Sequence, residues 1–264
     1  MITYLDSHSV SAEYVYWQME EARIRAFTTS TNRGMGAWFD ERWEFADSEA
    51  SRIFDPEQHG EDLQAVLFDR DVGVWPSDYF WQLSSAVVKD AVALFEIFLE
   101  QMANAVLCRF GARLTNLQTE NSWRWPECQA FYTHYIGVDV TPPKLEAALW
   151  IRNKLAHLRD ELRTDAGRAE FAAHVKVLGI DGPETPEEAA LGLVDHRAYM
   201  SHGVQLTQLQ TWRLLDVIGE HVGVVALAAF PFIYGGAFNG YLAAVQAKAP
   251  LTVAGFPAKT LITL

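Results

Sequence analysis

Residues 77–111 read SDYFWQLSSAVVKDAVALFEIFLEQMANAVLCRFG, and this stretch constrains the architecture more than any other. Ser77 and Asp78 are typical helix N-cap residues, and Gly111 is typical of a helix end. Between them, apolar residues recur every three or four positions, as on one face of an α-helix: Leu83, Val87, Ala91, Leu94, Phe98, Met102 and Val106. A narrow polar strip lies opposite: Lys89, Glu96, Glu100 and Asn104. We therefore predict one long helix with a buried face.

Similar spacing predicts further helices along the chain. They cover residues 12–28, 142–163, 166–178 and 207–225, with a short helix that starts at Thr185 and Pro186. Helix breakers crowd residues 29–76, which we expect to be rich in loops: Gly34, Gly36, Pro56, Gly60, Gly73 and Pro76. The one candidate strand is short and covers residues 200–206. The predicted fold class is all-α, with a helical bundle as its packing.

Composition and charge exclude several classes of protein. Of the 264 residues, 50% are hydrophobic, which excludes a disordered chain. The net charge of −13 excludes a protein whose whole surface tracks nucleic acid, although one basic cleft is compatible with it. Residues 1–80 hold 16 acidic and 6 basic side chains, so the excess is concentrated there. We predict that an acidic segment, residues 1–76, packs on a helical domain formed by residues 77–264.

The expected compartment is the cytoplasm. Two cysteines cannot form a framework of several disulfides, and the first residues show no signal-peptide pattern. Residues 221–247 contain no Asp, Glu, Lys or Arg and are long enough to span a bilayer. Pro231 and the pair Gly235-Gly236 interrupt them, so we expect a buried helical hairpin rather than a membrane span.

The motif that carries chemistry is Arg152-Asn-Lys-Leu-Ala-His157, on the helix predicted over residues 142–163. Asn153 and His157 are four residues apart and lie about 40° apart around the helix, away from the apolar stripe. Arg supplies a forked donor for phosphate oxygens, and His exchanges a proton near neutral pH. Residues 144–168 hold six basic and four acidic side chains, so this segment is positive within an acidic chain. The set suits a phosphodiester, although solvated helix faces often carry the same residue types.

Trp150-Ile-Arg-Asn-Lys-Leu-Ala-His157 resembles the signature of HEPN domains, which are helical nucleotide-binding domains of higher eukaryotes and prokaryotes. Their ribonuclease members carry an Arg, often followed by Asn, and a His four to six residues after the Arg. The resemblance covers about residues 77–225, and it is specific only at 150–158. Such domains often place a polar residue beside the motif on an earlier helix; Glu96 is the best match here and Glu100 the second.

The resemblance implies a metal-independent endoribonuclease without a cofactor that acts as a toxin or phage-defence effector. Arg152 would bind phosphate, His157 would transfer protons, Asn153 would orient one of them, and Glu96 would support them. Lys154 and Arg159 would contact the RNA, such as tRNA or mRNA. The products would carry 2′,3′-cyclic phosphate and 5′-hydroxyl ends. A homodimer in which two motifs share one cleft is implied, and a cognate antitoxin or regulator would fit this class.

Several alternatives stay open at the level of sequence. The chain departs from one HEPN subgroup, which has Tyr where Arg159 stands, so modification at that position is not expected. The other candidate function is a non-catalytic HEPN-like helical module that binds protein or RNA, in which the motif would serve dimer contacts and the acidic first 80 residues would be a partner surface. The histidines of Asp195-His196…His202 lack standard metal-ligand spacing, so no metal site is expected. Trp123 and Trp125 could stack on bases, but closing a helical core is the commoner role.

Overall fold

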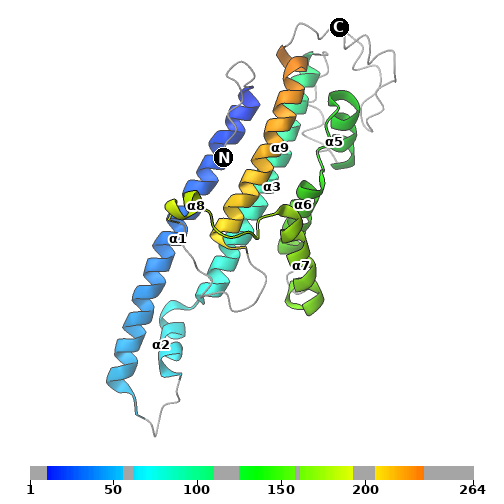
Figure 1. Cartoon of the computed structure of the whole chain (residues 1–264). Helices are drawn as coiled ribbons and strands as arrows, with labels where there is room; N and C mark the ends of the chain where they lie inside the picture. Colours follow the sequence, from blue (N-terminus) through cyan, green and yellow to red (C-terminus); the bar gives the residue numbers. More distant parts are fainter. Residues whose placement is uncertain (1–10, 56–61, 110–124, 158–160, 193–205, 235–264) are drawn as a thin grey trace. The chain divides into compact units, whose positions relative to one another are not determined.

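A computed structural model describes residues 11–55, 62–109, 125–157, 161–192 and 206–234. Helices dominate these residues, and no strand occurs among them, so the predicted all-α class is confirmed (Figure 1). The candidate strand at 200–206 falls outside the described residues except for Leu206, which is not in a strand.

In chain order, the described ranges form eight α-helices and two shorter helical turns. They are α1 (Ala12–Ile53), α2 (Leu63–Val72), α3 (Pro76–Arg109), α5 (Trp125–Phe131), the π-helical η2 (Tyr132–Ile136), α6 (Pro143–His157), the 3-10 helix η3 (Glu161–Arg163), α7 (Asp165–Leu178), α8 (Pro186–Ala190) and α9 (Gln208–Tyr234). The helices expected at 77–111, 166–178, 185 onward and 207–225 therefore correspond to α3, α7, α8 and α9.

The N-terminal region differs from the prediction. Helix α1 continues for 42 residues instead of ending near Thr28, and α2 occupies much of the remainder of the stretch expected to be rich in loops. Gly34 and Gly36 lie inside α1 and do not end it. The helix persists because its far half contributes Phe39, which is 1% exposed, to an aromatic core. Burial of such a ring outweighs the cost of about 1 kcal/mol for each glycine in a helix.

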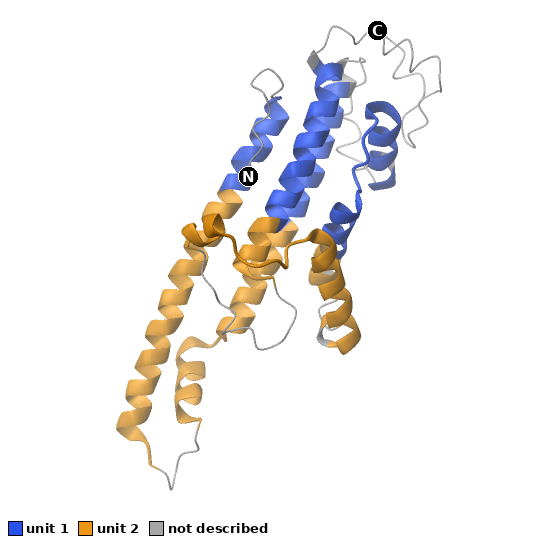
Figure 2. Cartoon of the chain, viewed as in Figure 1, with its two compact units in different colours: residues 1–22, 90–150, 214–264 blue, residues 23–89, 151–213 orange. Residues whose placement is uncertain are grey.

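The chain divides into two compact units, which Figure 2 colours separately. The first holds residues 1–22, 90–150 and 214–264, and the second holds residues 23–89 and 151–213. The predicted division into an acidic segment, residues 1–76, that packs on a helical domain of residues 77–264 stays a prediction.

The first unit is built around the C-terminal part of α3. Its fully buried residues Phe95, Leu99 and Met102 belong to the face that the sequence periodicity predicts or to the positions beside it. The hydroxyl of the buried Tyr132 donates a hydrogen bond to the carbonyl oxygen of Leu99, 2.6 Å away, and so ties η2 to α3. Burial of an aromatic ring with its polar end satisfied fixes the position of η2.

The second unit has a separate aromatic core. Phe39 of α1, Phe68 of α2 and Phe80 of α3 are each 1% exposed, and Ala46 packs with them. The rings meet in tilted and edge-to-face arrangements with centroid separations of 5.9–6.4 Å for Phe39 with Phe80 and with Phe68. Such arrangements suit the quadrupoles of aromatic rings. This core positions α2 against the second half of α1.

Helix α9 includes part of the charge-free stretch noted in the sequence. Gln208–Ile233 is long and apolar enough to cross a membrane by length and composition, and 44% of its most apolar window is buried inside the structure. Leu214, Ile218 and Val222 are among its fully buried residues, as expected for a core helix. The second arm of the predicted hairpin lies outside the described residues, and the cytoplasmic location stays a prediction.

Candidate functional site

Helix α6 carries the motif and starts one residue later than predicted, at Pro143. Leu145, Ala148 and Ile151 form its buried side, and Leu155 continues this side toward the C-terminus. The α-helical segment ends at His157 rather than at Arg163; the chain forms the 3-10 turn η3 at Glu161–Arg163. The motif therefore occupies the last two turns of α6.

The motif residues differ in exposure. Asn153 is exposed, whereas Arg152 and Lys154 are half-buried. His157 is the last residue of α6, and its side chain lies outside the described part of the structure, as does Arg159. Because α6 is α-helical throughout, positions 153 and 157 are one turn apart on the same face. The backbone arrangement required by the sequence motif is present.

Lys154 has a partner that the sequence analysis missed. Its ammonium lies 2.7 Å from a carboxylate oxygen of Glu161 in η3, and this hydrogen bond raises the pKa of Lys154. The Glu161 carboxylate offsets the positive charge of Lys154, which is predicted to contact RNA. The contact of Lys154 with RNA stays a prediction. For this contact, a phosphate oxygen would have to replace the Glu161 carboxylate as the partner of the Lys154 ammonium.

Glu96 belongs to the first unit, whereas the residues from Arg152 onward belong to the second. The predicted support of the motif by Glu96 is therefore untested. Within the first unit, Glu96 and Glu100 of α3 act electrostatically on Cys128 of α5. Burial, followed by these two negative charges, raises the pKa of the Cys128 thiol to about 12. Cys128 is thus a neutral, buried thiol rather than a nucleophile.

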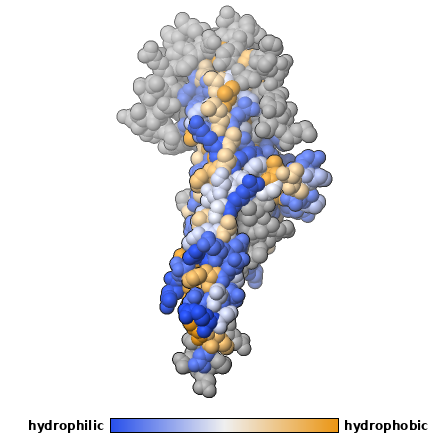
Figure 3. Space-filling model, turned by 90° about the vertical axis from the view of Figure 1, so that its left-hand side faces the viewer, coloured by the Kyte–Doolittle hydropathy of each residue, from blue (hydrophilic) through white to orange (hydrophobic). Residues whose placement is uncertain are grey.

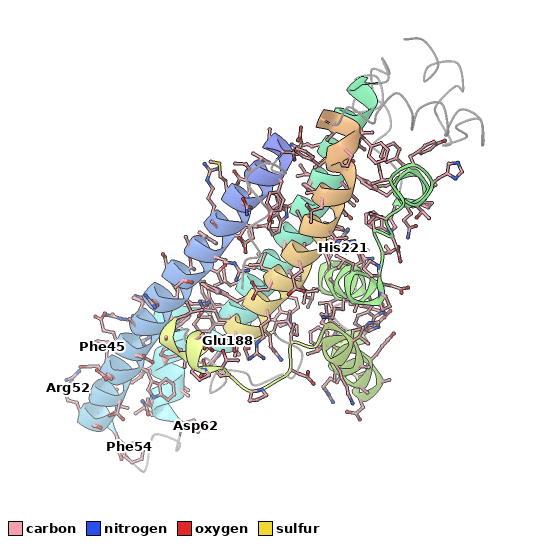
Figure 4. All side chains as sticks on the ribbon, turned by 45° about the horizontal axis from the view of Figure 1, so that its top comes forward. Phe45, Arg52, Phe54, Asp62, Glu188 and His221 are labelled. Carbon is pink, nitrogen blue, oxygen red and sulfur yellow. The ribbon has the colours of Figure 1, made fainter. Side chains whose placement is uncertain are left out.

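His221 of α9, which is labelled in Figure 4, belongs to the same unit. Burial lowers the pKa of its imidazole, opposed by a hydrogen bond with the backbone of Asp139. The ring also packs edge-on against Phe95, with centroids 6.0 Å apart. A neutral imidazole held between a backbone group and an aromatic ring fits a structural role for this histidine.

A metal centre has no candidate among the described residues, because no group of three or more His, Cys, Asp or Glu side chains could hold an ion there. The sequence candidate at Asp195, His196 and His202 lies outside those residues. Trp125 packs against Phe95 with ring centroids 6.4 Å apart, which favours the core interpretation of this tryptophan. Trp123 is outside the described ranges.

Chemically, the end of α6 offers a guanidinium, an amide and an imidazole within six consecutive residues of one helix. Such a set can bind an oxyanion and exchange a proton with it. No protein-family model, curated protein or solved structure matches the chain.

Proposed function

We propose that the protein is a metal-independent endoribonuclease of HEPN type. The observation that carries the proposal is the unbroken α-helical course of Pro143–His157, which keeps Asn153 and His157 one turn apart with Arg152 beside them. The residue types and their order match the motif of the family, and the all-α fold is compatible with it.

The chemistry follows from the properties of RNA. The ribose 2′-oxygen attacks the adjacent phosphorus and loses its proton, while the P–O5′ bond breaks and the leaving oxygen gains a proton. His157 serves one of these proton transfers, because imidazole accepts and donates near neutral pH. Arg152 neutralises charge on the phosphate oxygens, and Asn153 orients the phosphate or the imidazole. The products carry 2′,3′-cyclic phosphate and 5′-hydroxyl ends.

The proposed function also assigns roles to residues around the motif, to a second copy of the chain and to a regulator. Lys154 and Arg159 contact the RNA backbone, and Glu96 assists from α3. Two copies of the chain bring two motifs to one cleft, so that positive charge is concentrated on an otherwise acidic protein. The substrate is tRNA or mRNA, the role is that of a toxin or phage-defence effector in the cytoplasm, and a cognate antitoxin or regulator restrains it.

The decisive experiment compares purified wild type and His157→Ala on total cellular RNA in EDTA. We expect wild type to cut and the variant to lose at least about 100-fold in rate, since removal of a general acid–base costs that much. His134→Ala is the matched control, because His134 is an exposed histidine on η2 and should leave the rate unchanged. Products should carry cyclic phosphate ends.

Two outcomes would reject the proposal. Equal cutting by wild type and His157→Ala would indicate a contaminant or another site. Absence of cutting by folded wild type, also after mixing with an extract of phage-infected cells, would favour the alternative of a non-catalytic helical module that binds protein or RNA.

A further inference from the structure

The second half of α1 and the adjoining part of the second unit expose aromatic residues among acidic ones. We call this region the α1–α2 surface and define it by described residues 38–55 and 62–78. Its exposed aromatic side chains are Trp38 (37% exposed), Trp43 (41%), Phe45 (50%), Phe54 (50%) and Trp75 (39%). Single exposed hydrophobic residues scattered over a surface are common, but five exposed aromatic side chains within residues 38–75 are more than such scatter explains. Exposed apolar groups with polar neighbours mark interaction sites.

These rings are not needed to complete the core beneath them. Trp43 and Trp75 each pack against the buried Phe68, with ring centroids 5.2 and 5.5 Å away, and yet remain 41% and 39% exposed. Phe45 contacts the guanidinium of Arg42, whose Cζ lies 5.6 Å from the ring centroid. The rings are therefore held in place from one side and are available from the other, which lowers the entropic cost of binding.

The α1–α2 surface is negatively charged. Ten acidic and three basic residues occur in the two ranges, so this region holds more than half of the chain's excess of −13. Arg42 pairs with Glu41, and Arg52 pairs with Glu49 at 2.6 Å. By contrast, four carboxylates have no ion-pair partner among the described residues: Glu44, Asp47, Asp62 and Asp69.

Aromatic and acidic groups alternate around α1. At 100° per residue, the acidic positions Asp40, Asp47 and Glu44 lie between Trp43 on one side and Trp38 and Phe45 on the other. Figure 4 shows Phe45 and Arg52 on the side of α1 away from α2, and Figure 3 shows hydrophobic side chains set among hydrophilic ones on the face turned toward the viewer. A ligand that reached both flanks would cross the carboxylates between them.

We propose that the α1–α2 surface docks a basic amphipathic segment of a partner protein, with Lys or Arg side chains set between apolar ones. Glu44 and Asp47, which lie between the exposed rings of α1, receive the cations, and these rings receive the apolar side chains and the cations' aliphatic stems. The excess of negative charge opposes RNA, an anionic membrane and a second copy of the same surface. This docking is independent of the proposed nuclease activity.

The test measures binding of the full chain to labelled helical peptides of about 18 residues, which is about five turns. The first peptide has a leucine face and a lysine face, the second replaces every Lys by Glu, and the third replaces every Leu by Ser. We expect only the first to bind with a micromolar Kd. Raising NaCl from about 0.05 to about 0.3 M should weaken that binding at least tenfold, because charge pairs at the surface are screened.

Paired variants localise the contact. Phe45→Ser and Asp47→Lys should each weaken binding about tenfold, as expected when one anchoring group of an interface is lost. Phe27→Ser removes a ring that is even more exposed from α1 outside the surface, and Glu170→Lys makes the same charge change on α7; both should bind as wild type does. Circular dichroism verifies that each variant is folded.

The remaining outcomes overturn the proposal. Equal binding by all variants would mean attraction to net charge alone, and absence of binding would mean that no such partner docks. Concentration-dependent dimerisation of the chain that Phe45→Ser abolishes would assign the surface to a second copy instead. Loss of RNA cleavage in His157→Ala leaves this test unaffected, so the two proposals stand or fall separately.

Discussion

The side chain of Arg213 holds three backbone carbonyl groups and one carboxylate in the second unit. Its guanidinium donates to both carboxylate oxygens of Glu188, each at 2.6 Å, and to the carbonyl oxygens of Ile180, Gly182 and Pro183. A lysine could not reproduce this forked set of contacts. The sequence identifies the start of α8 from Thr185 and Pro186, but it does not identify Arg213, which lies 25 residues after Glu188.

The pair of Glu188 and Arg213 should make stability depend on pH in the acid range. Hydrogen bonds from Arg213 lower the pKa of Glu188 from 4.5 to about 2. A lowered pKa in the folded state stabilises the protein fully above 4.5, and this contribution is lost as the pH falls toward 2. We expect wild type to have a larger free energy of unfolding than Glu188→Gln above pH 4.5. This difference should shrink as the pH falls from 4.5 toward 2.

Denaturant unfolding of both proteins at a series of pH values provides the measurement. Glu187→Gln removes a neighbouring exposed carboxylate from the same helix and serves as the control. A difference between wild type and Glu188→Gln that stays constant from pH 6 down to about 2.5 would show that the ion pair does not stabilise the fold.

At the scale of elements, two glycines test how the helices are built. Gly34 lies inside α1, and an added Cβ would meet no atom within 4 Å. Gly167 lies in the first turn of α7, where an added Cβ would fall about 2 Å from the carbonyl oxygen of Glu161 and collide with the backbone of η3. We expect Gly34→Ala to stabilise the protein by about 0.5–1 kcal/mol and Gly167→Ala to destabilise it by about 1–3 kcal/mol.

Thermal unfolding followed by circular dichroism separates the two substitutions. Both replace one hydrogen by one methyl group in a helix, so each serves as the control for the other. Equal effects would mean that helix propensity alone determines the result, and a destabilising Gly34→Ala would contradict the helical course of α1 through residue 34.

Periodicity and end signals predicted those helices whose apolar faces are long and whose breakers lie outside them. Helix α3 follows its expected stripe, and the capping box of Thr185 and Glu188 starts α8. The prediction for α1 was wrong because Gly34 and Gly36 are typical of a loop. The helix continues through them because Phe39, beyond both glycines, is buried. Contacts between distant parts of the chain decide that burial, and no local pattern encodes them.

In the candidate site, too, the sequence predicts the local relations between residues but not the contacts that depend on packing. The sequence predicts the helical placement of Asn153 and His157 because their relation is local. It does not predict the contact between Lys154 and Glu161, because the helix ends between them and the turn that follows sets their separation. The influence of Glu96 on Cys128 likewise depends on packing between two helices.

At the scale of the whole molecule, the two compact units share their helices. Each of α1, α3, α6 and α9 contributes residues to both units. Loss of either unit would therefore leave four helices with an end that has no packed surroundings, which is costly because most helical stability comes from packing. We expect the chain to unfold in one cooperative transition rather than unit by unit.

Calorimetry of two variants, one in each unit, checks this expectation. Tyr132→Phe removes the hydrogen bond to Leu99 in the first unit and should cost about 1 kcal/mol. Phe68→Ala removes a buried ring of the second unit and should cost about 3–5 kcal/mol. Both should shift the same single transition in proportion to these costs. Two separate transitions, or a variant that shifts only part of the signal, would contradict it.

The π-helical turn η2 has a consequence for how the length of the chain can change during evolution. The amide of Gly137 bonds to the carbonyl oxygen of Tyr132, five residues earlier, whereas an α-helical turn would use an amide one residue closer. The turn thus holds one residue more than an α-helix needs. Deleting the exposed Thr133 or His134 could be absorbed by a return to α-helical bonding, with the buried residues on either side keeping their places. A helix that can lose a residue without a new loop gives an ancestral chain and its descendants a route between two lengths at constant fold.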